Sequence, residues 1–156
     1  MIKKILLIIL TITFFSCERD DICIDETTPK LIVVFYDNNN PLERKDAPNL
    51  KVAIDSLGTF IEVSPISNDS ITIPLRVDVD LTKIRLTKQE TDEDEITDDF
   101  NLNYIRDEVF VSRSCGFKTT YSETDAENLT NNWISSLTIN NQTITDETTK
   151  HISIFH

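Results

Sequence analysis

Apolar and polar residues alternate with a period of two in several separate stretches of this chain. The clearest stretches are residues 70–77, 100–105 and 151–154. Side chains on a strand point alternately to opposite faces, so this period predicts half-buried β-strands. Helical periodicity is not sustained anywhere, and the one candidate for helix is a single turn over residues 125–131. We therefore expect an all-β protein.

The individual strands and turns indicate how the sheets are arranged. Residues 31–36, LIVVFY, are apolar at every position and predict a central strand covered on both sides. Pro74 cannot donate to a strand ladder, so its strand is expected at a sheet edge or with a bulge. Asn140 and Asn141, between LTI and QTI, are predicted to form a two-residue hairpin turn. Eight to ten short strands at this spacing predict an antiparallel β-sandwich of Greek-key, immunoglobulin-like kind, with a small β-barrel as the alternative.

The N-terminus has the layout of an export signal. Lys3 and Lys4 precede an uncharged apolar run over residues 5–15, which is followed by Ser16 and Cys17. A helix of that length spans only about 16 Å, roughly half of a hydrocarbon core, so a signal peptide is favoured over a membrane span. The junction resembles a bacterial lipobox, which would make Cys17 the lipidated first residue of the mature chain. An ordinary signal peptide followed by a chance cysteine is the alternative.

This interpretation divides the chain into three parts: a lipoprotein signal peptide over residues 1–16, an acidic tether over 17–28 and a single β-sandwich domain over 29–156. The acids that follow Cys17 resemble the run that marks export to the outer face of the outer membrane in Bacteroidetes lipoproteins. A solvated tether that keeps the domain off the bilayer is the alternative. The expected location is the outer membrane, lipid-anchored, facing either the periplasm or the cell surface.

The charge balance restricts the partners. The chain has 15 basic and 27 acidic residues and a net charge of −12. Removal of residues 1–16 takes away two lysines and no acid, which makes the mature chain more negative still. Such a chain repels phosphate backbones and anionic head groups, so nucleic-acid binding is not expected. The membrane is expected to be contacted through the N-terminal lipid.

The three cysteines are odd in number until Cys17 is assigned to lipid. Cys23 and Cys115 then remain as an even pair in an oxidising compartment, and we predict that they form a disulfide. Closing a loop of that length stabilises a fold by about 4–5 kcal/mol in the chain-entropy model. Two buried or idle thiols are the alternative. A catalytic redox pair is disfavoured because the chain has no Cys-x-x-Cys motif.

Four segments of the chain carry a family resemblance: CERDDIC (17–23), TPKLIVVFYDNNNP (28–41), DEVFVSRSCGFKTTY (107–121) and KHISIFH (150–156). Together they resemble an uncharacterised lipoprotein family of the Bacteroidetes, classed as a domain of unknown function, over essentially the whole chain. The resemblance implies a lipid anchor and places Cys23 and Cys115 in recurring segments. It implies no reaction, ligand or catalytic residue.

Metal-ligating residues are sparse in the sequence. His151 and His156 are the only histidines and are predicted to lie at an edge or on the surface, because zinc needs three or four ligands. Asp78 and Asp80 are weak candidates for Ca²⁺ ligands on an extended segment, and residues 91–95 add further carboxylates. An acidic, solvated turn is the alternative for both segments. No metal or cofactor is therefore predicted.

Motifs of catalysis are also missing. The chain has no G-x-S-x-G elbow, and two isolated glycines cannot build a phosphate-binding loop. No catalytic residue is predicted, and the protein is not expected to be an enzyme. Trp133, with Tyr104 and Tyr121, is a candidate sugar-stacking platform, with a core position as the alternative.

Two tripeptides resemble the O-glycosylation motif of the Bacteroidetes, an acid followed by Ser or Thr and an aliphatic residue. They place candidate glycosylation sites at Ser56 and Ser70. The motif is short and chance matches are common, and the intact mass of the native protein tests it.

These observations favour a non-enzymatic lipoprotein whose β-sandwich is a binding or accessory module for an envelope protein partner. A lipoprotein that captures carbohydrate or another nutrient beside an outer-membrane transporter is the second candidate, and an envelope hydrolase is the third. An exposed aromatic patch around Trp133 would favour capture, and convergent carboxylates in a deep pocket would favour an enzyme. An apolar patch on a polar surface would favour a protein partner.

Overall fold

The computed structural model describes residues 22–23, 28–63, 69–89 and 94–156, and within these segments it contains nine β-strands. The strands are β1 (Leu31–Tyr36), β2 (Lys51–Ser56), β3 (Thr59–Val63), β4 (Ser70–Ile73), β5 (Leu81–Gln89), β6 (Glu95–Ser112), β7 (Gly116–Asn128), β8 (Ser136–Ile139) and β9 (Ile152–Phe155). The described part of the chain has no helix. It therefore has no helix that is long and apolar enough to cross a membrane. The helical turn predicted over residues 125–131 is wrong, because β7 continues through its first half.

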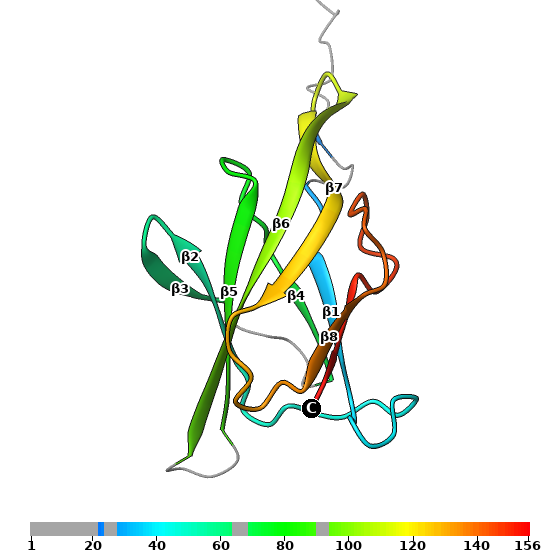
Figure 1. Ribbon diagram of the computed structural model, residues 1–156. Coiled ribbons are helices and arrows are strands. Elements are labelled where there is room, and N and C mark those ends of the chain that lie inside the picture. The colour runs from blue at the N-terminus through cyan, green and yellow to red at the C-terminus, as the bar shows by residue number, and fades with distance from the viewer. Residues whose placement is uncertain (1–21, 24–27, 64–68, 90–93) are drawn as a thin grey trace, which may run out of the picture.

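The strands form two sheets that pack face to face (Figure 1). One sheet has the strand order β4-β1-β9-β8 and the other has the order β3-β2-β5-β6-β7. Neither sheet closes into a barrel in the described residues, so the predicted β-sandwich is confirmed and the barrel alternative is set aside. The chain crosses between the sheets after β1, β3, β4 and β7. Such crossings are typical of Greek-key sandwiches.

One strand pair departs from the predicted antiparallel arrangement. β1 and β9 run parallel, with Val33 opposite Ile152 and Tyr36 opposite Phe155. Parallel neighbours need a long connection, and here the whole five-stranded sheet lies between the two strands in sequence. β9 therefore lies between β1 and β8, covered on both faces, although its sequence alternates.

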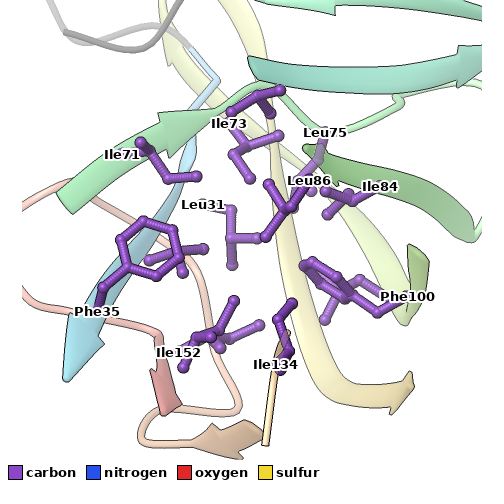
Figure 2. Packing of buried hydrophobic residues seen from close by; sticks show 14 of the residues in the cluster. Leu31, Phe35, Ile71, Ile73, Leu75, Ile84, Leu86, Phe100, Ile134 and Ile152 are labelled. Carbon is purple, nitrogen blue, oxygen red and sulfur yellow. The ribbon is translucent and has the colours of Figure 1, made fainter. Parts of the chain in front are cut away.

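The core fills the space between the two sheets (Figure 2). The predicted central strand is confirmed, because β1 lies between β4 and β9 and is buried at four of its six positions. The alternation over residues 100–105 is also confirmed, since its three inward side chains are buried and Ile105 is exposed. The largest fully buried side chains are Tyr121, Phe35, Phe100, Leu31, Ile73, Ile84, Leu86, Leu102, Ile134, Ile144, Ile152 and Ile154.

Two local predictions have different outcomes. β4 is an edge strand and ends at Ile73, directly before Pro74, as the missing N–H of proline requires. The hairpin turn predicted at Asn140 and Asn141 is wrong, because β8 pairs with β9 and residues 140–151 form the connecting loop. Ile144 of this loop forms an isolated antiparallel β-bridge with Tyr121 of β7, and its side chain is buried. These contacts hold the loop against β7.

The β6–β7 hairpin is longer than the sandwich that it belongs to. β6 has 18 residues and β7 has 13, and the paired strands extend beyond the four-stranded sheet at the top of Figure 1. Irregularities in the pairing occur between Asn103 and Ile105, and again between Phe110 and Ser112. The inner part of the hairpin therefore belongs to the core, and its outer part projects from the fold.

Candidate functional site

A disulfide joins the tip of this hairpin to the start of the described chain. Cys23 and Cys115 are bonded, with their Cα atoms 4.8 Å apart and a separation of 92 positions in the sequence. The pairing predicted from the cysteine count is therefore present. The backbone N–H of Thr119 also donates to the Oγ1 of Thr28, 3.1 Å away, so the same segment lies against β7. Cys17 and the predicted signal peptide lie outside the described residues, and the lipid anchor remains a prediction.

Large apolar side chains near the hairpin tip and beside Cys23 face solvent. Phe110 and Phe117 are opposite each other on β6 and β7, with ring centroids 5.4 Å apart in an edge-to-face contact. Their exposed fractions are 57 % and 66 %, and Val109 on the other face of the hairpin is 43 % exposed. Ile22, next to Cys23, is 81 % exposed. We call Ile22, Val109, Phe110 and Phe117 the tip cluster.

The tip also differs from the rest of the protein in charge. No carboxylate occurs from Val109 to Ser122, although the chain has 27 acidic residues in total. The same stretch carries Arg113 and Lys118, and the Lys118 ammonium donates to the Thr145 carbonyl oxygen at 3.3 Å. The hairpin end is therefore apolar and basic in its own residues, whereas the N-terminal segment bonded to it, residues 17–28, has five acids and one arginine.

A buried carboxylate that the sequence analysis missed organises the opposite part of the fold. Asp98 is fully buried and accepts three backbone N–H groups, from Asn132 at 2.7 Å and from Trp133 and Ile134 at 2.8 Å each. Burial favours the neutral acid, but these hydrogen bonds outweigh it and hold the pKa of Asp98 below its usual value. The signal was available in the sequence, because Asp98 shares the inward face of Phe100.

The loop that Asp98 holds carries Trp133 into the core. The indole is only 8 % exposed, and its Nε1–H donates to the carbonyl oxygen of Leu86 at 3.2 Å. Its ring centroid lies 5.2 Å from that of His156 and 6.2 Å from that of Phe35. Of the two alternatives for Trp133, the structure has the core position and not the sugar-stacking platform, because the side chain is held inside the sandwich.

The two tyrosines of the predicted platform are also core residues. Tyr104 and Tyr121 are buried, with ring centroids 4.8 Å apart. The Tyr104 hydroxyl lies 2.6 Å from the Thr82 hydroxyl and donates to the Arg76 carbonyl oxygen at 2.9 Å. Burial raises the pKa of Tyr121 to about 12. Neither ring is available to stack on a sugar.

The histidines are buried, so the prediction of edge or surface positions is wrong. His151 is 1 % exposed, and its Nδ1 accepts the backbone N–H of Ile32 at 2.9 Å. His156 packs edge-on against Trp133 and Phe35. The two histidines are buried because β9 lies between β1 and β8, so the residues at both ends of this strand are covered by the rest of the fold.

These histidines predict a loss of stability in mild acid. Burial lowers the pKa of His151 and of His156, so both are neutral in the folded chain. The unfolded chain binds more protons once the pH falls below about 6.5, and stability therefore decreases as the pH falls further. Thermal unfolding from pH 7.5 to 5 measures this slope. His151→Gln keeps an acceptor for Ile32 and is expected to reduce the slope, whereas identical slopes in both proteins contradict the assignment.

The weak Ca²⁺ candidates are held by guanidinium groups instead. Asp78 pairs with Arg76, and Asp80 pairs with Arg106 at 2.6 Å. The hydrogen bond from Arg76 holds the pKa of Asp78 below its ordinary value. Across the part of the chain that the structure describes, no group of three or more His, Cys, Asp or Glu side chains is arranged to hold a metal.

The two candidate glycosylation sites lie at the ends of strands. Ser56 is the last residue of β2, next to the exposed Leu57 of the β2–β3 turn. Ser70 is the first residue of β4, and its hydroxyl donates to the Asp69 carboxylate at 3.2 Å. Both sites remain predictions.

The protein is thus a β-sandwich with a projecting hairpin that a disulfide ties to the N-terminal segment. Residues 51–156 match a family of unknown function (DUF6452), and the chain belongs to that family. The predicted membership of an uncharacterised family is confirmed to this extent. No curated protein and no solved structure matches the chain.

Proposed function

We propose that this protein is a lipid-anchored component of the cell envelope, attached to the outer membrane through Cys17. The observation that carries the proposal is the Cys23–Cys115 disulfide, which uses two of the three cysteines of the chain. Structural disulfides form and persist in oxidising compartments, in agreement with export by residues 1–16. The resemblance to Bacteroidetes lipoproteins supports the same location at the outer membrane.

The β-sandwich is proposed to act as a non-catalytic binding or accessory module for an envelope protein. Carbohydrate capture is not proposed, because the aromatic side chain that would favour it, Trp133, is buried. The buried carboxylate Asp98 is not proposed as a catalytic acid or base, because backbone N–H groups occupy both of its oxygens. Among the exposed features, the tip cluster places several large apolar side chains at one end of the fold, whereas Leu42 and Leu57 are exposed in separate loops.

The anchor is tested by expressing the full chain in a bacterium with an outer membrane. Wild-type protein is expected to show the mass of an acylated Cys17, to accumulate as a precursor under globomycin and to fractionate with membranes. Cys17→Ala is expected to lose the acyl mass and leave the membrane fraction, because an acyl anchor is the only membrane element that the proposal requires. Ser16→Ala keeps a small residue before the cysteine and serves as the matched control. Unchanged processing and fractionation of Cys17→Ala would disprove the anchor.

A further inference from the structure

We propose that the tip cluster inserts into the interfacial layer of the membrane, next to the lipid at Cys17. This inference rests on the proposed function, because it requires Cys17 to be acylated. It assigns a membrane-contacting role to the outer end of the β6–β7 hairpin. The domain would then be held to the bilayer at two adjacent points, the lipid and the hairpin tip.

Chain length places the tip near the lipid. Cys23 is six residues after Cys17 in the sequence, and six extended residues span at most about 20 Å. The disulfide joins Cys23 directly to Cys115, in the turn between β6 and β7. The hairpin tip is thus tethered within a short distance of the acylated residue. Because the bond fixes which end of the sandwich is tethered, the opposite end is free to point away from the bilayer.

The exposed side chains suit the boundary between head groups and acyl chains. Phe110 and Phe117 present aromatic rings on one face of the hairpin, and Val109 presents an aliphatic group on the other. Paired strands and the disulfide fix these groups in place, so little ordering is required when they enter the interface. Large exposed apolar side chains grouped at one point mark an interaction surface.

Local charge in the hairpin itself is compatible with the same orientation. The chain as a whole repels anionic head groups, with its net charge of −12. From Val109 to Ser122 the hairpin has no carboxylate and carries Arg113 and Lys118, which anionic lipids attract. The segment bonded to it is acidic, with five acids and one arginine over residues 17–28, so the orientation rests on the lipid tether and the exposed apolar side chains and not on charge.

Depth-dependent quenching tests the proposal on the lipidated mature protein in vesicles of phosphatidylethanolamine and phosphatidylglycerol. Phe110→Trp introduces an indole in the tip cluster, and Phe117→Trp places one on the opposite strand. Leu42→Trp is the matched control, because Leu42 is 94 % exposed and belongs to the β1–β2 loop. Figure 1 shows this loop, in cyan, at the other end of the molecule from the tip of the β6–β7 hairpin. The buried Trp133 is common to all variants and supplies the background signal.

Lipids brominated on their acyl chains near the head group are expected to quench the indole introduced by Phe110→Trp or Phe117→Trp by roughly half, since interfacial side chains reach that depth. The indole introduced by Leu42→Trp is expected to show no quenching. Acylated protein in which neither tip variant is quenched overturns the inference alone and leaves the tip cluster to a protein partner. Intact mass without acyl groups overturns the proposed anchor, and this inference falls with it.

Discussion

Replacing both Cys23 and Cys115 with alanine is expected to lower the free energy of unfolding by about 4–5 kcal/mol, as the chain-entropy model gives for a loop of this length. The bond closes a loop that contains β1 to β6 and most of the described chain. A loss of that size is comparable to the entire stability of many small domains, which is about 5–15 kcal/mol. Chemical unfolding under non-reducing conditions, followed through the fluorescence of Trp133, measures the change.

The matched control for this experiment is the third cysteine. Cys17→Ala replaces a cysteine but leaves the Cys23–Cys115 bond intact, so the stability of its folded domain is expected to equal that of wild type. Reduction of the wild-type protein is expected to reproduce the double variant. A change in the double variant no larger than the roughly 0.5 kcal/mol of ordinary surface substitutions would contradict the expectation.

Hydrogen exchange separates global from local destabilisation in the same variant. The outer part of the β6–β7 hairpin lies beyond the core (Figure 1), and the disulfide is its covalent connection to the N-terminal segment. Loss of the bond is therefore expected to accelerate exchange first at residues 105–118, because segments with few buried contacts open most readily. If only these amides accelerate, the bond stabilises the tip and not the whole domain.

Alternation and composition were sufficient to predict the sandwich but not its topology. The apolar run of β1 and the proline after β4 each have a local physical consequence, burial on both faces and an edge position, and both are found. The parallel pairing of β1 with β9 has no local signal, because the direction of β9 depends on the course of the chain through the other sheet. The burial of His151 and His156 follows from that pairing, and the sequence prediction failed there for the same reason.

The site was predictable where chemistry depends on residue type alone. The cysteine count predicted the Cys23–Cys115 bond, because two cysteines remained once Cys17 was assigned to lipid. Phe110 and Phe117, in contrast, have the sequence pattern of ordinary core strands. They are exposed because β6 and β7 extend past the sheet that would cover them, a consequence of tertiary structure that no local pattern encodes.

Asp98 shows how a single buried carboxylate decides which residues form the core. It lies 35 positions before Trp133 and holds the backbone of residues 132–134, which places Trp133 and Ile134 between the sheets. Asp98→Asn is expected to lower the free energy of unfolding by about 3–5 kcal/mol. The asparagine has an NH2 group in place of one carboxylate oxygen, and this group donates, so backbone N–H groups that faced that oxygen lose their acceptor. Urea unfolding at pH 7 measures the loss.

The neighbouring Asp99 supplies a matched control for this variant. Asp99 forms a two-point ion pair with Arg85 at 2.8 Å, half-exposed on the outer face of the sheet, so Asp99→Asn is expected to cost no more than about 1 kcal/mol. Because the pKa of Asp98 is lower in the folded chain, its stabilisation is complete above the ordinary pKa of about 4 and is lost as the pH falls below it. Asp98→Asn is therefore expected to flatten acid unfolding below about pH 4 as well as to lower stability at pH 7. Equal losses in the two variants would mean that the backbone of the Trp133 loop is held by its own packing and not by the buried charge.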